Sequence, residues 1–488
     1  MSESATNTIK HTGIYGVGIV ARNMASFLML PIYTRYLTPE DYGVIELLSM
    51  VLDVVGILMG VRIGQAIFRY YARSNSLLER NRTISTALFL VLALNLLGMA
   101  VVMLTAQPVS RLILGDTAYA GALALFSVTL VLMALELVPL TFIRAQQRPW
   151  LFVSFSVGKL LVQISLNIYF VVYKHLGVDG VIYAAIGSSG LMAVLLTAYT
   201  FRHVGAEFCY KSARQLASFS IPLIFAALGS FYVTFGDRYF LRIFVGLEEV
   251  GIYSLGYKFG FLLAMVTWRP FQQVWDVQRY DVGKLSNANE VFGRTFVFIS
   301  LAMITAALAI ALFTKDFLKV MSAPEFWGAH EIVPIIVVAY LFQCWTNYCR
   351  YGLLLSEQTF QVAIGSGIAV VVITVGYLTL IPNYGGIGAA IATLTAFASR
   401  FFWENFQSKR AYDMELPWSR VRGILGLAAI IFLLSYLIPD RMVVSLTLRF
   451  LVFGIYIGAL FVLPILSKEE RVALVESIRN PLGLIASR

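Results

Sequence analysis

The chain has 488 residues, of which 59% are hydrophobic and 13% are charged, and its mean hydropathy is +0.78. This composition leaves too little polar surface to cover a water-soluble globule, which excludes most soluble enzymes. A helix that crosses a bilayer needs about 20 mostly apolar residues, so the apolar content alone could fill about 14 spans. The composition therefore predicts a polytopic α-helical membrane protein.

Hydropathy in windows of about 20 residues predicts fourteen spans in chain order. The first apolar stretch contains Arg22 and continues past Pro31 without a small-residue cleavage site, so we interpret it as a retained span and not as a signal peptide. The fourteen predicted spans lie near residues 12–34, 42–67, 83–106, 119–143, 150–173, 179–201, 214–236, 250–275, 292–314, 332–355, 360–381, 386–406, 421–438 and 442–466.

The loop charges predict the orientation of these spans. Of the 37 Lys and Arg residues, 24 fall on the N-terminal side, eight on the opposite side and five within spans. The positive-inside rule therefore predicts a multi-pass protein of the cytoplasmic membrane with both termini in the cytoplasm. The net charge of +10 follows from this loop bias, so no nucleic-acid partner is needed to explain it. The longest outer connection, residues 315–331, is too short for a soluble domain, so we expect the function to lie inside the helix bundle.

An internal repeat relates the two halves of the chain. Gly43 in TPEDYGVIEL and Gly251 in GLEEVGIYSL follow the first and seventh spans and differ by 208 positions. We infer a parallel repeat of two six-helix lobes, residues 1–208 and 209–416, followed by two extra helices and a cytoplasmic tail in residues 417–488. The same offset relates Gly177 to Gly385 and Gly180 to Gly388.

Charged residues within the spans are candidates for function, because a charge in mid-bilayer costs roughly 2.5 to 3.5 kcal/mol and needs a partner or a water-filled cavity. Basic residues outnumber acidic ones at the deeper positions, which favours a cavity that accepts a phosphate or an acidic headgroup. The basic candidates for substrate binding are Arg22, Arg62, Lys159, Lys258 and Arg269. The acidic candidates for ion coupling are Asp53, Glu136 and Asp237.

Each of these residues also has a structural interpretation. Asp53 could neutralise Arg22 or Arg62, and Lys159 could join Gln163 and Asn167 in hydrogen bonds between helices. Arg269 could extend to the membrane interface, as could Arg238, Arg350 and Arg449. Gly56, Gly60 and Gly64 could form a face for close helix packing.

Several kinds of chemistry have no signal in the sequence. Three cysteines and four histidines show no metal-ligand spacing, and no GxxxxGK[ST] loop, GxSxG elbow or HExxH helix occurs. We therefore expect no metal, no cofactor and no enzymatic activity. A secondary transporter or a flippase is the class that fits best.

Four blocks of the sequence resemble a known family. They are VARNMASFLMLPIYTRYLTPEDYGVIELL within residues 18–48, IRAQQRPWLFVSFSVGKLLVQISLNIYFVV in 143–172, GDRYFLRIFVGLEEVGIYSLGYKFG in 236–260 and IPNYGGIGAAIATLTAF in 381–397. They are similar to the Wzx-type polysaccharide biosynthesis proteins, which are lipid-linked oligosaccharide flippases of the multidrug/oligosaccharidyl-lipid/polysaccharide exporter superfamily.

The resemblance implies two six-helix lobes around a central cationic cavity, with the last two helices packed outside. It implies alternating access that moves an undecaprenyl-diphosphate oligosaccharide to the outer leaflet for O-antigen, exopolysaccharide or capsule synthesis. Membrane lipid, a polymerase, a chain-length regulator and a proton or sodium counter-ion are the implied partners. A drug or metabolite exporter, a lipid II flippase and a membrane-embedded polysaccharide polymerase or ligase stay open as alternatives.

Overall fold

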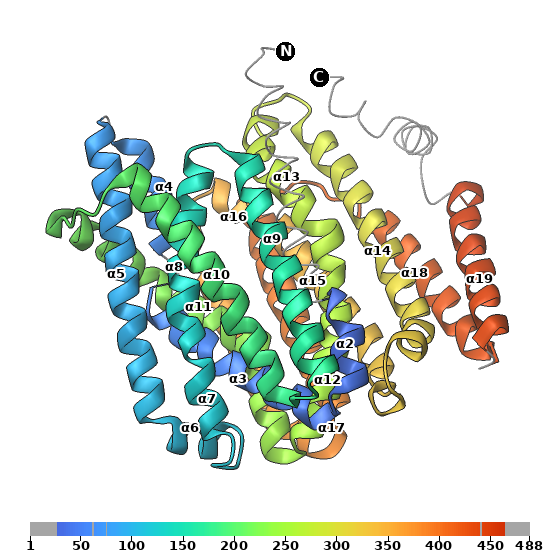
Figure 1. Cartoon of the computed structure of the whole chain (residues 1–488). Coiled ribbons are helices and arrows are strands. Elements are labelled where there is room, and N and C mark those ends of the chain that lie inside the picture. The colour runs from blue at the N-terminus through green and yellow to red at the C-terminus, as the bar shows by residue number, and fades with distance from the viewer. Residues whose placement is uncertain (1–26, 61–62, 75, 440–441, 464–488) are drawn as a thin grey trace. The chain divides into compact units, whose positions relative to one another are not determined.

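The computed structural model describes residues 27–60, 63–74, 76–439 and 442–463, and these ranges contain helices and no strand (Figure 1). Twelve of the described helices are long and apolar enough to cross a membrane. One of them, α17 (Thr359–Ala411), contains two predicted spans, because Gly385 with φ 51° and ψ −130° divides it. The polytopic α-helical class is confirmed, and most of the first predicted span lies outside the described residues.

The described helices divide between two compact units, which consist of residues 1–255, 321–326 and 373–392 and of residues 256–320, 327–372 and 393–488. The helices up to residue 255 are α2 (Leu30–Tyr36), α3 (Pro39–Leu58), α4 (Ile63–Arg73), α5 (Leu77–Leu104), α6 (Ala106–Ile113), α7 (Ala120–Phe126), α8 (Val128–Ala145), α9 (Pro149–Asn167), the π-helical η1 (Ile168–Tyr173), α10 (Gly177–Val204), α11 (Tyr210–Phe244) and the start of α12 (Leu247–Leu263). The predicted lobe boundary at residue 208 concerns the sequence repeat and stays a prediction.

The remaining helices follow in chain order. They are the π-helical η2 (Ala264–Trp268), α13 (Arg269–Val282), α14 (Ala288–Met321), the short η3 (Pro324–Phe326), α15 (Ala329–Cys349), α16 (Tyr351–Leu355), α17, α18 (Trp418–Leu434), η4 (Ser435–Leu437) and α19 (Met442–Val462). Residues 315–331, which the sequence predicts as an outer loop, are therefore largely helical.

Local sequence signals explain where α3 begins. The side chain of Thr38 accepts a hydrogen bond from the backbone N–H of Asp41, and the Asp41 carboxylate accepts one from the N–H of Thr38. This reciprocal capping box satisfies two N–H groups that have no partner inside the helix. Pro39 occupies the first turn, where its missing N–H costs nothing. The segment TPED thus fixes the position at which the chain enters its second span.

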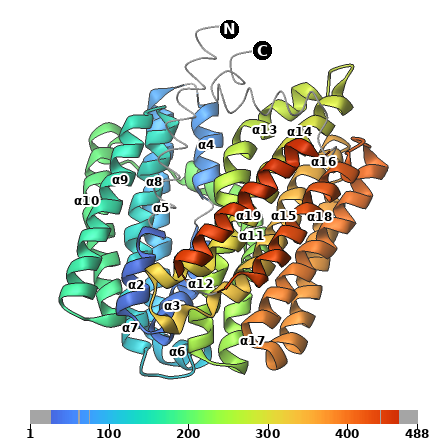
Figure 2. The same cartoon turned by 90° about the vertical axis from the view of Figure 1, so that its right-hand side faces the viewer.

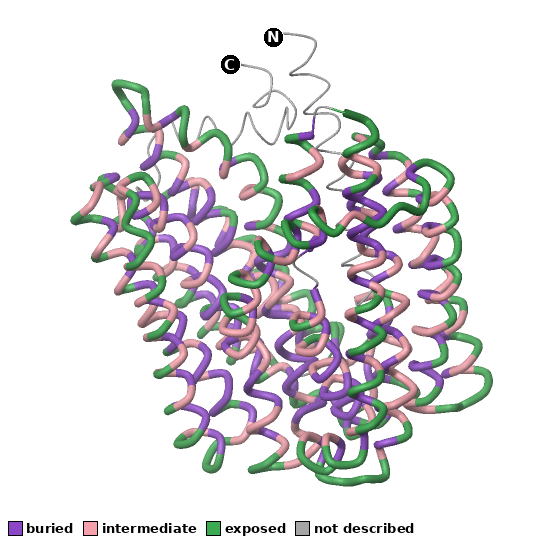
Figure 3. Tube along the Cα trace, turned by 90° about the vertical axis from the view of Figure 1, so that its left-hand side faces the viewer, coloured by how far each residue is buried: buried purple, intermediate pink, exposed green. Residues whose placement is uncertain are grey.

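The core of the first unit lies between α4, α5, α8, α10 and α11, where apolar side chains from all five helices are buried together. Figure 3 shows buried segments along the helices and exposed segments at the turns between them. Lipid tails are as apolar as these side chains, so close packing and interhelical hydrogen bonds contribute more to helix association here than the removal of apolar surface from water.

In the second unit, a polar contact joins the last span to α14. The Nε of Arg449 on α19 lies 3.3 Å from Oδ2 of Asp316, and Ser445 donates a hydrogen bond of 3.0 Å to Oδ1 of the same carboxylate. Arg449 also donates to the carbonyl of Leu312. Figure 2 shows α18 and α19 side by side. Arg449, for which the sequence left extension to the interface open, is thus buried in an ion pair.

Candidate functional site

Two glycines that the sequence repeat relates cross at close range within the first unit. A Cβ atom on Gly43 of α3 would collide with the carbonyl oxygen of Leu247, and one on Gly251 of α12 would collide with that of Pro39. Each added Cβ would also lie 3.2 Å from the backbone N of the other glycine. Pro39 and Leu247 differ by the same 208 positions as the glycines. The two helix starts therefore meet in a contact with approximate two-fold symmetry, which only glycine permits.

The other repeat-related glycines also share their conformations. Gly177 has φ 57° and Gly385 has φ 51°, a left-handed conformation that glycine adopts without strain. Glu249 links this turn to the start of α12, because its Oε1 accepts a hydrogen bond of 2.8 Å from the backbone N–H of Gly386. Gly177 and Gly385 are thus both glycines at positions of positive φ, and the repeat itself stays a prediction.

A polar depression of about 330 Å³ lies beside the glycine crossing. Glu40, Asp116, Tyr119 and Arg242 contribute polar side chains to its lining. The Nη2 of Arg242 donates to the carbonyls of residues 111 and 112 at 3.0 Å each, and the hydroxyl of Tyr119 donates to Oε1 of Glu40 at 3.3 Å. Burial, together with the charge of Glu40, raises the pKa of Tyr119. These contacts join α11 to α6 and the start of α3 to the start of α7.

Two of the predicted site residues, Lys159 and Glu136, pair with each other. The Nζ of Lys159 on α9 lies 2.8 and 2.7 Å from the two carboxylate oxygens of Glu136 on α8. The side chain of Glu136 is 8% exposed and that of Lys159 is 22% exposed. Asn167, two turns further along α9, accepts a hydrogen bond of 3.2 Å from the hydroxyl of Tyr33. These polar contacts join α8 to α9 and α9 to α2.

Asp237, another predicted residue, lies in a fully buried ion pair with its neighbour Arg238. The Oδ1 of Asp237 is 2.6 Å from Nη1 of Arg238, and its Oδ2 accepts a hydrogen bond of 2.5 Å from the hydroxyl of Tyr253. The guanidinium also packs over the rings of Tyr253 and Phe235. Arg238 thus remains within the protein and does not extend to the interface. The pair connects α11 to α12 about half a turn beyond Gly251.

The remaining predicted residues lie apart from these pairs. Arg22 and Arg62 fall outside the described residues. Asp53 is exposed in the middle of α3, whereas Lys258 on α12 is half-buried. Arg269 is exposed at the start of α13, and its guanidinium lies over the ring of Phe261 at 4.7 Å.

Helical geometry changes at corresponding positions of the two repeats, by a break in the first and by a π-helical turn in the second. The sequence predicts one span over residues 42–67, but α3 ends at Leu58 and α4 begins at Ile63, with φ 102° at Gly60 between them. Gly60 therefore breaks the helix and does not extend a packing face. The π-helical η2 ends at Trp268, which lies 208 positions after Gly60, and Pro270 follows at once. Such departures from regular α-helix often occur at functional sites.

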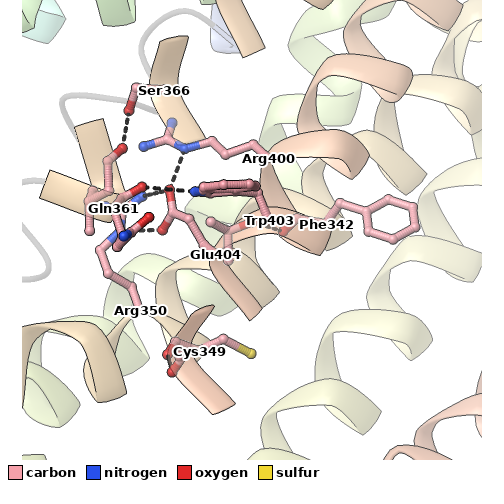
Figure 4. A network of polar contacts seen from close by, with 11 residues as sticks. Phe342, Cys349, Arg350, Gln361, Ser366, Arg400, Trp403 and Glu404 are labelled. Carbon is pink, nitrogen blue, oxygen red and sulfur yellow. Dashed lines mark hydrogen bonds and ion pairs between the residues drawn. The ribbon is translucent and has the colours of Figure 1, made fainter. Parts of the chain in front are cut away.

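The strongest polar cluster of the second unit is one that the sequence reasoning missed. Glu404 on α17 binds both Arg350 and Arg400 (Figure 4). Arg400 and Glu404 are four positions apart on one helix, a spacing that could have signalled the pair. Among the described residues, no group of three or more His, Cys, Asp or Glu side chains is placed to hold a metal ion.

Comparison with known proteins identifies the family. Residues 8–275, more than half of the chain, match the family described as polysaccharide biosynthesis protein. The chain belongs to this family. It is also similar to the probable low-salt glycan biosynthesis flippase Agl15 of Haloferax volcanii, with 22% identity over 262 residues. That match covers 51% of this chain and 53% of Agl15, so the chain spans about half the length of this relative.

The fold of this family member is that of solved membrane transporters. The lipid II flippase MurJ, in an inward closed conformation, is similar with a TM-score of 0.73 and 13% identity, over 92% of this chain and 98% of MurJ. An inward-facing multidrug resistance transporter of the MATE family and the MOP superfamily has a TM-score of 0.61 at 16% identity, over 80% and 95% of the two chains. Identities this low show the fold alone.

Proposed function

We propose that this family member is a flippase that moves a polyprenyl-diphosphate-linked oligosaccharide from the inner to the outer leaflet of the cytoplasmic membrane. The polyprenyl carrier is undecaprenyl, and the product is an O-antigen, exopolysaccharide or capsule. Membership of the polysaccharide biosynthesis family, the similarity to a probable glycan flippase and the MurJ-like fold support this function.

The helix break at Gly60 and the π-helical turn η2 at the corresponding position of the second repeat carry the proposal. Both departures from regular α-helix alter the backbone hydrogen bonding beside charged residues within the predicted spans. Arg62 follows the break at Gly60, and Lys258 and Arg269 flank η2. Guanidinium and ammonium groups suit a diphosphate because their charge-assisted hydrogen bonds offset the cost of removing the phosphates from water.

In this mechanism Arg22, Arg62 and Lys258 hold the diphosphate, with Arg269 at the edge of the site. Lys159, which contacts Glu136 at 2.7 Å, is the further basic residue proposed to contribute to substrate binding. The polyprenyl tail stays in lipid, so only the headgroup passes through the cavity.

Alternating access would use the crossing of Gly43 and Gly251. The crossing lies at the helix ends that the charge bias predicts to be extracytoplasmic, with both termini in the cytoplasm. Release of the oligosaccharide outside would require α3 and α12 to separate there. Asp53, Glu136 and Asp237 are the proposed coupling residues for a proton or sodium ion, and a polymerase and a chain-length regulator would use the exported units.

Neutralising the three central cations tests the proposal. We expect the triple variant Arg22→Gln, Arg62→Gln, Lys258→Gln to insert stably but to lose export of the polysaccharide. Arg82→Gln is the matched control, because Arg82 forms a solvent-exposed ion pair with Glu207, and such pairs contribute little to stability. Normal export by a stably inserted triple variant would refute the proposed roles of these cations.

A further inference from the structure

The cluster around Glu404 in the second unit contains two arginines but only one carboxylate. Arg350, between α15 and α16, donates from Nε to Oε2 at 2.8 Å and from Nη2 to Oε1 at 3.1 Å. Arg400 donates from Nε to Oε1 at 2.8 Å (Figure 4). Two guanidinium groups thus share one carboxylate, and the cluster has a net charge of +1.

The carboxylate itself is fully enclosed. The side chain of Glu404 is 0% exposed, and a Cβ atom on Gly365 would lie 2.9 Å from its Cγ and 3.1 Å from its Oε1. One bidentate arginine would satisfy this carboxylate, since both oxygens already accept from Arg350. The second arginine is therefore not required to neutralise Glu404, and its burial adds a desolvation cost.

The two arginines keep unused donors at the accessible side of the cluster. Arg350 is 21% exposed and Arg400 is 15% exposed. In the described part of the chain, Nη1 of Arg350 and both terminal nitrogens of Arg400 have no hydrogen-bond partner, and none of the three is a fully buried atom. Figure 4 shows the terminal nitrogens of Arg400 turned away from the carboxylate.

The depth of the cluster in the membrane indicates the ligand. Glu404 lies seven residues before the end of α17 at Ala411, which corresponds to about 10 Å along the helix. Lys409 and Arg410 occupy that end, which the charge bias predicts to be cytoplasmic. Trp403, next to Glu404, donates a hydrogen bond of 3.2 Å to the carbonyl of Gln361, and the adjacent Phe360 is 74% exposed. The predicted span over residues 386–406 ends two residues after Glu404, so the cluster is expected at the level of the cytoplasmic lipid headgroups.

We propose that Arg350 and Arg400 form a binding site for the phosphate group of a membrane lipid in the cytoplasmic leaflet. Glu404 positions the guanidinium groups, and their free N–H groups bind the phosphate oxygens. The phosphate belongs either to a resident anionic phospholipid or to a polyprenyl diphosphate. The site is independent of the proposed substrate residues on α3 and α12, and lipid binding here does not require transport.

The decisive variant is Arg400→Gln, which removes one guanidinium but leaves the bidentate pair of Arg350 and Glu404 intact. We expect it to fold with the stability of the unmodified protein and to bind phosphatidylglycerol about tenfold more weakly, because charge-assisted donors to phosphate are lost. Arg410→Gln is the matched control, since Arg410 is exposed on the same helix and stacks on Phe406 at 4.2 Å.

The assay is native mass spectrometry of the full-length protein, with thermal unfolding measured in parallel on the same samples. Phosphatidylglycerol should bind and raise the unfolding temperature, whereas phosphatidylcholine should compete poorly. Displacement by a polyprenyl diphosphate would support the site and identify the transported lipid class as its ligand. Without displacement, a resident phospholipid is the ligand.

Three results would overturn the inference. They are unchanged lipid binding by folded Arg400→Gln, equal weakening by Arg410→Gln, and failure of the unmodified protein to bind either phosphatidylglycerol or the polyprenyl diphosphate. Glu404→Gln separates the effect of the ion pairs on stability from lipid binding, because it removes the ion pairs but keeps both cations. We expect it to lower the unfolding temperature while lipid still restores part of that loss.

Discussion

Adding one methyl group at the glycine crossing should favour separation of α3 and α12. In Gly251→Ala the methyl group would collide with the backbone carbonyl of Pro39, and in Gly43→Ala with that of Leu247. Neither carbonyl can rotate away, because each belongs to the first turn of a helix. Overpacking of this kind costs about 1 to 3 kcal/mol. The ratio of separated to crossed molecules would therefore rise about 5- to 150-fold.

Cysteine labelling measures this ratio directly. Val44 is 1% exposed beside Gly43, so Val44→Cys should react slowly with a membrane-impermeant maleimide, in a background where Cys209 is replaced by Ser. Gly251→Ala should raise the labelling rate at least about fivefold. Gly229→Ala on α11 is the control, because a Cβ there meets no atom within 4 Å. Equal labelling of the Gly251→Ala and Gly229→Ala proteins would refute this interpretation of the crossing.

The buried ion pairs give two further predictions, both measured by thermal unfolding of the purified protein. Lys159→Gln leaves Glu136 buried without its cation, so it should lower the stability more than the double variant Lys159→Gln, Glu136→Gln does. A double variant whose loss of stability equals the sum of the losses in the two single variants would contradict this. Asp237→Asn should cost about 3 kcal/mol because Arg238 loses its buried partner, whereas Tyr253→Phe removes one hydrogen bond and should cost about 1 to 2 kcal/mol. Equal losses for the two variants would show that the ion pair adds nothing to that hydrogen bond.

The architecture could be predicted because its signals are local or periodic. Apolar runs of about 20 residues located the spans, and the 208-residue offset found glycines that the fold uses in equivalent ways. Gly43 and Gly251 cross each other, and Gly177 and Gly385 both have a positive φ. Where two backbones approach so closely that no Cβ atom fits, only glycine is tolerated, and this requirement is visible in the sequence.

Pairings between helices could not be predicted in the same way. Lys159 and Glu136 are 23 residues apart, and their contact depends on how α8 and α9 are rotated against each other. A similar uncertainty concealed the cluster at Glu404, where Arg350 approaches from 54 positions away. The break at Gly60 was hidden because the flanking residues are as apolar as an uninterrupted span. Hydropathy registers the length of a span but not its backbone continuity.

The leaflet that holds lipid-linked oligosaccharide in a strain lacking this protein tests the proposed function most directly. Spheroplasts of that strain would be treated with a probe that modifies only sugars on the outer face, and the extracted lipid-linked oligosaccharides would then be assayed for modification. A flippase function predicts that these intermediates accumulate and stay protected until the unmodified gene is restored. Intermediates that the probe reaches as readily as in the parent strain would show that flipping proceeds without this protein.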